Sequence, residues 1–188
     1  MLKRLFYIVV LWLLGIQFVF SQLYPVQVVP QLIPPYSTKL SEYATTSQDK
    51  LIVQLLLSDL NESSRQVRLK MYIEGNGISV RSTDYIVGAN PIYLDGGIPL
   101  RLSNVDLRPY FELQNLQGLS PEQYNKPLND GLYKICFEAY DYITGQRLSQ
   151  KSCSIAYMVL NDPPILNMPI RGENIALRDP QNIIFSWT

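Results

Sequence analysis

The 188-residue chain contains no histidine. This absence excludes Ser-His-Asp and Cys-His catalysis, histidine-ligated metal sites and the usual proton shuttle near neutral pH. The chain also lacks an excess of either charge, because 16 basic side chains are balanced by 16 acidic ones. Nucleic acids and anionic membrane surfaces favour a clustered positive excess, so the composition supports neither as a partner.

Residues 1–21 have the pattern of a secretory signal peptide. Lys3-Arg4 form a short positive region, and residues 5–20 are almost wholly apolar. Ser21 then provides a small residue before a cut ahead of Gln22. The alternative is a retained N-terminal membrane anchor, because the apolar run is not far short of the length of a span.

Cleavage of this segment would leave an exported protein with no membrane span. We therefore expect it in the periplasm, associated with the outer membrane, or at the cell surface. Export also bears on the only two cysteines, Cys136 and Cys153. In an oxidising compartment two cysteines form a disulfide far more often than a metal or redox site.

The composition and the apolar pattern predict an all-β domain. The 13 tyrosines, 13 prolines and 10 glycines fit short strands separated by turns better than long helices. Residues 50–57 are largely apolar on both faces, as in a strand inside a sandwich, and residues 66–74 alternate between apolar and polar side chains. Further extended segments are expected at residues 22–35, 36–43, 78–81, 85–87, 92–94 and 98–102. The predicted fold is an antiparallel β-sandwich of the immunoglobulin or fibronectin kind.

Residues 104–126 depart from this pattern of short strands and predict a short helical crossover between the sheets. Ser120 is an expected N-cap with Pro121 in the first helical turn. Upstream, one face of a short helix is indicated by the spacing of Val105, Leu107, Tyr110, Phe111 and Leu113. The crossover is either a plug over an open end of the sandwich or a mobile functional lid.

Residues 131–162 predict a β-hairpin with a built-in crosslink. If Thr144-Gly145 form a two-residue loop closed by Ile143 and Gln146, Cys136 falls directly opposite Cys153. The two cysteines would form a non-hydrogen-bonded pair, the closer antiparallel geometry and one that a disulfide can bridge.

The prolines of Asn161-Asp162-Pro163-Pro164 cannot donate to a strand ladder, so they end the hairpin. The expected organisation is a signal peptide at 1–21, a β-sandwich domain at 22–162 and a linker at 163–172. Residues 179–188 predict a turn and an apolar strand that ends in Trp187, similar to an early strand of a fibronectin type III domain. Residues 173–188 are therefore expected to begin a second, incomplete fibronectin-like domain of a longer modular protein.

Candidate catalytic and metal-binding groups are few. Asp130, Glu138 and Asp141 could belong to a glycosidase-like pair only if two of them faced each other across a cleft; solvated strand faces and turns are the alternative. Asp95-Gly96-Gly97 and Asn161-Asp162 carry calcium-type oxygens, but the chain has no D-x-[DN]-x-[DN]-G loop, and turns explain both.

Gly75-Asn76-Gly77 lacks the lysine and the helix of a phosphate-binding loop. No catalytic, cofactor-binding or metal-binding residue is therefore predicted, and Cys136 and Cys153 remain as the predicted disulfide. Five tyrosines could form an aromatic platform for glycan or protein, although tyrosines on half-buried strands also serve as packing residues. They are Tyr72, Tyr85, Tyr93, Tyr140 and Tyr142.

A set of short phrases runs along residues 22–188. They are Pro25-Val26-Gln27-Val28, Gln31-Leu32-Ile33-Pro34-Pro35-Tyr36-Ser37, Val67-Arg68-Leu69, Ile73-Glu74-Gly75-Asn76-Gly77, Cys136-Phe137-Glu138, Leu160-Asn161-Asp162-Pro163-Pro164 and Asp179-Pro180-Gln181-Asn182. Together they resemble the TANFOR domain of exported Bacteroidota proteins. The resemblance implies export, a modular protein with fibronectin-like domains, and a setting of type IX secretion and gliding. It implies no catalytic residues.

These observations predict a non-enzymatic structural or interaction module of a larger cell-surface or envelope protein, with other protein domains or envelope proteins as partners. The alternative is a carbohydrate-binding accessory domain that presents tyrosines to polysaccharide. An enzyme is the third hypothesis, and it would have to rely on carboxylates alone.

Overall fold

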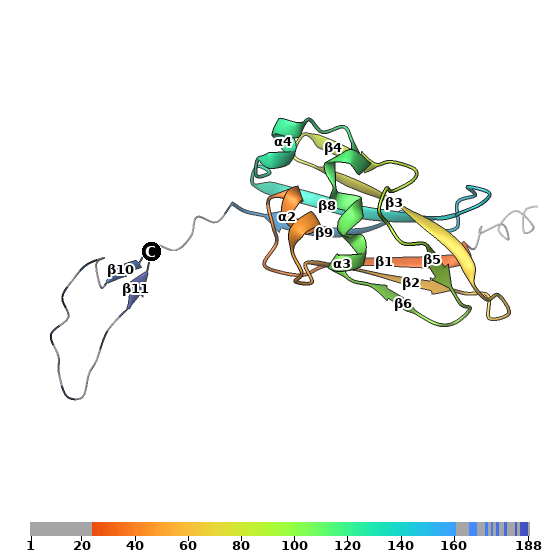
Figure 1. Ribbon diagram of the computed structural model, residues 1–188, viewed down its shortest axis with the longest axis horizontal. Coiled ribbons are helices and arrows are strands. Elements are labelled where there is room, and N and C mark those ends of the chain that lie inside the picture. Colours follow the sequence, from red (N-terminus) through yellow and green to blue (C-terminus); the bar gives the residue numbers. More distant parts are fainter. Residues whose placement is uncertain are drawn as a thin grey trace, which may run out of the picture.

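The computed structural model describes residues 24–160 without a gap and, beyond them, residues 166–168, 172, 174, 176, 179, 183 and 185–187 (Figure 1). The predicted signal segment and Asn161-Asp162 lie outside the described residues, as does most of the expected linker and second domain. No helix within the described part of the chain is long and apolar enough to span a membrane.

Two antiparallel sheets pack face to face, which confirms the predicted all-β sandwich (Figure 1). The smaller sheet has the order β1-β2-β6, and the larger has the order β7-β4-β3-β8-β9, with β5 paired to the first residues of β3. The strands of the smaller sheet are β1 (Val26–Leu32), β2 (Leu51–Leu57) and β6 (Leu100–Leu102). Those of the larger sheet are β3 (Arg65–Gly75), β4 (Ile78–Ser82), β5 (Ile92–Leu94), β7 (Leu116–Gln117), β8 (Gly131–Asp141) and β9 (Ser152–Met158).

The core follows from strict alternation along the two longest strands. Val67, Leu69, Met71 and Ile73 of β3 are buried, and so are Tyr133, Ile135, Phe137 and Ala139 of β8. The β3–β8 register places Met71 beside Phe137 and Ile73 beside Ile135. Cross-strand pairs of this kind stabilise a sheet, and their burial removes a continuous apolar face from water.

The smaller sheet meets the larger one along β1 and β9. Leu32 N–H donates to Ser154 Oγ over 3.0 Å, and Val26 N–H donates to the Leu148 carbonyl over 3.0 Å. The extended segment expected at residues 22–35 contains β1, which is an edge strand of its sheet, and Pro30 lies within it.

The predicted helical crossover is present, but it is not one helix. It consists of α3 (Asn104–Leu107), two 3₁₀ turns, η2 (Arg108–Phe111) and η3 (Leu113–Asn115), then β7 and α4 (Pro121–Asn125). Tyr110 and Phe111 are buried in the core, whereas Val105 is exposed. The predicted N-cap is confirmed, because Ser120 Oγ accepts from Gln123 N–H at 3.2 Å. The buried aromatic side chains support the interpretation of a plug.

The segment expected as an edge strand at residues 36–43 instead contains α2 (Leu40–Thr45). Leu40, Tyr43 and Ala44 are buried, with the spacing of one helix face, and the Tyr43 ring stacks on Phe111 at 5.0 Å. This apolar spacing is the feature of the sequence that could have predicted the helix. A helix is favoured over the expected strand because it places Tyr43 against Phe111 of the crossover.

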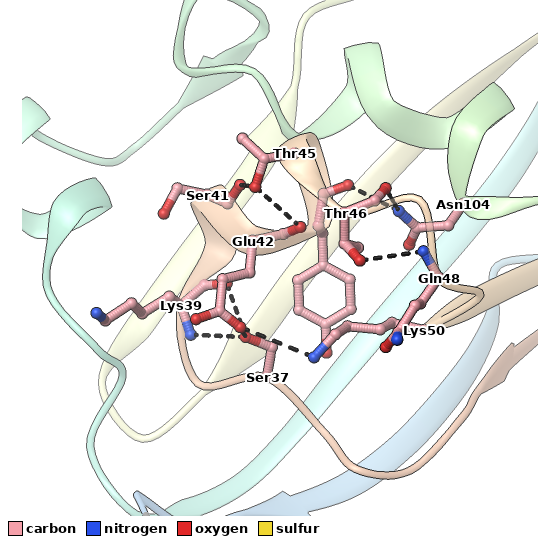
Figure 2. A network of polar contacts seen from close by, with 10 residues as sticks. Ser37, Lys39, Ser41, Glu42, Thr45, Thr46, Gln48, Lys50 and Asn104 are labelled. Atoms are coloured by element: carbon pink, nitrogen blue, oxygen red, sulfur yellow. Dashed lines mark hydrogen bonds and ion pairs between the residues drawn. The ribbon is translucent and has the colours of Figure 1, made fainter.

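Figure 2 shows how polar side chains hold α2 in place. Glu42 accepts a hydrogen bond from Ser37 Oγ and lies 3.8 Å from Lys50 Nζ. At the other end of α2, Asn104 Nδ2 donates to the carbonyls of Tyr43 and Thr46 at 3.0 and 3.2 Å. Asn104 is the first residue of α3, so it ties the two helices together.

Residues 85–87, expected as a strand, belong to the loop between β4 and β5, and β6 begins two residues later than expected. The turn at Gly75-Asn76-Gly77 is confirmed, with Asn76 and Gly77 at φ 40° and 82°. These values fit the two-residue turn that matches the twist of a hairpin.

The predicted disulfide is present, but the predicted hairpin loop is wrong. Asp141 and Gln146 close the loop, with Asp141 N–H donating to the Gln146 carbonyl at 2.8 Å, so the loop comprises residues 142–145. Residues 149–151 then bulge opposite the single residue Glu138, because Ala139 pairs with Leu148 while Phe137 pairs with Ser152. The bulge offsets the shift in register that the longer loop would cause.

Cys136 therefore still faces Cys153, with a disulfide and a Cα–Cα distance of 4.0 Å. Buried Ser149 stabilises the bulge, because its Oγ accepts from Ala139 N–H at 2.7 Å. The hydroxyl replaces the ladder partner that a continuous strand would have supplied.

The two ends of the sandwich domain lie far apart. Val26 contacts Leu148, beside the last residues of β8, whereas Met158 pairs with Gly131 at the first residue of β8. The separation along β8 is about 25 Å at 3.3 Å per residue. Two short strands follow, β10 (Leu166–Met168), within the segment expected as a linker, and β11 (Ser186–Trp187), and they pair antiparallel.

Replacing both cysteines, C136A/C153A, should lower the free energy of unfolding by about 3 kcal/mol, because the disulfide closes a short loop in the unfolded chain. Urea unfolding of the oxidised protein and the double variant measures the difference. Peptide mapping without reductant provides the control, and free thiols in the exported protein would contradict the pairing.

Burial raises the pKa of Tyr43 to about 12, and it raises that of Tyr110 to about 12 as well. An unfolded tyrosine ionises near pH 10, so this contribution to stability is present below pH 10 and is lost as the pH rises from 10 toward 12. The Tyr43 hydroxyl makes no hydrogen bond of normal geometry. Tyr43→Phe should therefore cost little at pH 7 and reduce the alkaline loss of stability by about 1 kcal/mol per pH unit above pH 10. Urea unfolding between pH 7 and 11 tests both expectations, and an unchanged slope would contradict them.

Candidate functional site: the outer face of the large sheet

The outer face of the large sheet carries the polar half of the alternating strands. Arg68, Lys70, Tyr72 and Glu74 project from β3, and their partners on β8 are Tyr140, Glu138, Cys136 and Lys134. The predicted disulfide lies on this face and not in the core. It crosslinks β8 to the edge strand β9 beside Tyr72.

Glu138 is the centre of a hydrogen-bonded cluster on this face. The residue is 5% exposed, and its Oε2 accepts from the hydroxyls of Tyr72 and Tyr140, each at 2.7 Å. Its Oε1 lies 3.0 Å from Arg147 Nη2. Burial and the hydrogen bond to Glu138 raise the pKa values of both tyrosines, so they remain donors. Both carboxylate oxygens are therefore engaged by side chains of the domain itself.

The three candidate carboxylates are not brought together as an acid–base pair. Asp130 and Asp141 lie at opposite ends of β8, about 35 Å apart, whereas glycosidase carboxylates are about 5–10 Å apart. Glu138 and Asp141 are closer along the strand, but they point to opposite faces of the sheet. Thr144 N–H donates to Asp141 at 2.8 Å and, with the Thr144 hydroxyl and Arg65, lowers the pKa of Asp141. Asp141 therefore stays ionised and holds the hairpin loop.

The calcium candidate at Asp95-Gly96-Gly97 is a structural turn. Asp95 Oδ1 accepts from Ser64 N–H at 2.8 Å, and Gly96 N–H and Gly97 N–H donate to the carbonyls of Glu62 and Leu57. A Cβ on Gly96 would lie 2.0 Å from the Asp59 carbonyl oxygen, so close backbone approach requires glycine here. Within the described residues, no three carboxylate or thiol side chains are grouped to hold a metal ion.

Three of the five candidate tyrosines gather around Arg68, and we call Arg68, Tyr85, Tyr140 and Tyr142 the tyrosine cluster. The Arg68 guanidinium lies 4.7 Å from the Tyr85 ring centre and 5.5 Å from that of Tyr140. Tyr142 meets Tyr85 edge to face at 6.1 Å. Tyr85 is 61% exposed and Tyr142 38% exposed, so the cluster presents aromatic surface to solvent.

The other two tyrosines lie apart from this cluster. The Lys151 ammonium group lies 4.2 Å from the centre of the Tyr72 ring, and the Tyr72 hydroxyl donates to Glu138. Tyr93 lies opposite Gln66, on the β5 side of β3, and is exposed. Of the predicted platform, the structure therefore retains Tyr85, Tyr140 and Tyr142.

The loop that carries Tyr85 is anchored by hydrogen bonds on both sides of that residue. Asn115 is buried, and its side chain exchanges two hydrogen bonds with the backbone of Val87, at 3.0 and 2.9 Å. Arg68 Nη1 donates to the Asp84 carbonyl and Lys70 Nζ to the Asp84 carboxylate, both at 2.6 Å. A preorganised aromatic side chain loses little conformational entropy when a partner binds.

A hollow of about 80 Å³ adjoins the cluster. Val67, Leu69 and Ile92 contribute an apolar lining, and Asp84 and Asn90 contribute polar groups. Typical ligand pockets measure about 300–1,000 Å³, so only part of a ligand could enter this hollow.

A second hollow, of about 270 Å³, is lined mainly by apolar side chains of β5 and β6 and by Tyr110. Its carboxylate, Asp106, accepts from Ser103 N–H at 2.8 Å as the cap of α3. Neither hollow brings together groups for catalysis.

Sequence reasoning missed Arg68, Arg147 and Asn115. Arg68 is visible only as one polar position in the alternation of β3. Arg147 reaches Glu138 only because the bulge at 149–151 and the loop at 142–145 place it opposite Tyr140. Asn115 lies in the crossover, far in sequence from the loop that it holds.

No protein-family model and no curated protein matches the chain. Among solved structures, the chain is similar to Bacteroides uniformis beta-glucuronidase 2, in a structure covalently bound to cyclophellitol-6-carboxylate aziridine. The match covers 74% of this chain and 13% of that chain, with 9% identity and a TM-score of 0.35. A score this low carries no argument about family or activity.

Glu138→Gln should destabilise the domain by about 2–3 kcal/mol, because the amide has one acceptor oxygen: if that oxygen accepts from the two tyrosine hydroxyls, the amide nitrogen faces the Arg147 donor and the ion pair is lost. Urea unfolding at pH 7 measures the loss. Glu62→Gln is the matched control. Glu62 pairs with Arg65 at a more exposed position, where the expected cost is under about 1 kcal/mol. Equal losses in the two variants would contradict a structural role specific to Glu138.

Proposed function

We propose that the chain is a non-enzymatic interaction module of a larger exported protein, and that it binds a protein partner through the tyrosine cluster. The observation that supports this proposal most directly concerns Tyr85. Its side chain is exposed, stacks on Arg68 and contacts Tyr142, and its loop is anchored by hydrogen bonds. Tyrosine and arginine are enriched among the residues that dominate protein–protein binding energy. The saturated state of Glu138 and the commitment of Asp141 to its loop also favour binding over catalysis.

The proposal includes the setting inferred from the sequence. A TANFOR-like domain of the immunoglobulin or fibronectin kind would serve in the periplasm, at the outer membrane or on the cell surface, in connection with type IX secretion or gliding. The chain leaves β9 at the end of the sandwich opposite to Val26, which supports a module followed by further domains, since that end can join the segment that follows.

A carbohydrate-binding domain is the second candidate, and the hollow beside Tyr85 favours it. A sugar ring has an apolar face that can stack on tyrosine and hydroxyl groups that can bond to Asp84 and Asn90. Insoluble polysaccharides and a glycan array at millimolar concentration test this candidate. Binding that is weakened by Tyr85→Ala would support it, and no binding would exclude it.

For a protein partner, a photoreactive amino acid at position 85 of the exported protein should give a discrete adduct with an envelope protein. Arg68→Ala should reduce its yield at least tenfold, since loss of a central arginine costs about 2 kcal/mol. Tyr93 is the matched control position, because its exposure of 54% is close to the 61% of Tyr85 and it lies outside the cluster. Equal adducts from positions 93 and 85 would contradict the proposal.

A further inference from the structure

The end of the domain at which the chain leaves β9 carries a second exposed surface, separate from the tyrosine cluster. Leu132 and Tyr157 are cross-strand partners on the outer face, and Ile155 lies two residues before Tyr157 on the same face. Val159 and Leu160 continue the chain from there and are also exposed. We call these five residues the C-terminal patch.

The C-terminal patch is apolar to a degree that solvated strands rarely show. Leu132, Ile155 and Tyr157 are 53%, 55% and 61% exposed. Single exposed apolar residues are ordinary, but a contiguous stripe along an edge strand marks an interaction surface. Among the ionic neighbours of the patch, Glu74 binds Lys151 at 2.6 Å, and Lys134 lies directly opposite Ile155 on the same face.

We propose that the C-terminal patch is the docking surface for the strand pair β10–β11 of the same chain, so that the sandwich packs against the segment that follows it. Only five residues separate Leu160 from Leu166. They span at most about 22 Å between the two Cα atoms, and the patch itself extends about 17 Å from Leu160 to Ile155. The strand pair is therefore within reach of the patch.

The strand pair offers a complementary surface. Met168 of β10 is 55% exposed, and Phe185, next to β11, is 58% exposed. Methionine and aromatic side chains are enriched in the buried centres of interfaces. A short tether also gives an effective concentration in the millimolar range, so a contact too weak to form between separate molecules is populated within one chain.

Methyl NMR of the full chain tests the proposal directly. With labelled isoleucine, leucine and methionine methyl groups, nuclear Overhauser effects are expected between Met168 and Ile155 or Leu132. The amides of β10 and β11 should also tumble with the same correlation time as those of β8. Tyr157→Ser should abolish both signals, and Phe185→Ser should do the same from the other side of the contact.

Val29→Ser is the matched control, because Val29 is 53% exposed on β1 of the small sheet and should leave both signals unchanged. A mixture of labelled and unlabelled chains distinguishes a second copy as the occupant. Effects seen only between chains, or faster independent tumbling of β10 and β11 with no contact to the patch, would overturn the proposal. None of these outcomes depends on whether the tyrosine cluster binds a partner.

Discussion

The antiparallel pairing of β3 with β8 organises both faces of the large sheet. It runs without a break from Val67 opposite Asp141 to Gly75 opposite Tyr133. Because successive side chains point to opposite faces, this register decides two surfaces at once. One face becomes the core around Met71 and Phe137, and the other carries Tyr72, Glu138 and Arg68. A slip by one residue would exchange them.

The outer face keeps its polar groups in place by pairing them internally. Glu138 binds two tyrosines and Arg147, and the disulfide fixes β9 beside β8. The strands therefore form a rigid base from which Tyr85 and Tyr142 project. The proposed binding role depends on this support for the exposed aromatic groups.

The hairpin shows how a correct pairing can follow from an incorrect local argument. A two-residue loop at Thr144-Gly145 would place Cys136 opposite Cys153, and the disulfide is present. The real loop is longer, and the bulge at residues 149–151 restores the register. Ser149, Leu148 and Val26 make that bulge possible, because they satisfy backbone groups that the ladder leaves unpaired. These are contacts between distant segments, which loop chemistry does not contain.

The features that depend on near neighbours in the chain could be predicted from the amino-acid sequence. The alternation of Val67, Leu69, Met71 and Ile73 specified a half-buried strand, and Ser120-Pro121 specified a helix start, because periodicity and capping act within a few residues. It also indicated the sandwich and the cysteine pair. Packing between distant segments favoured a helix over the expected strand at residues 40–45, since Tyr43 packs against Phe111 there. Tertiary packing likewise selected Tyr85, Tyr140 and Tyr142 from the five candidate tyrosines. Arg68 and Asn115 arrange them, and cation–π contacts and buried hydrogen bonds depend on proximity in space.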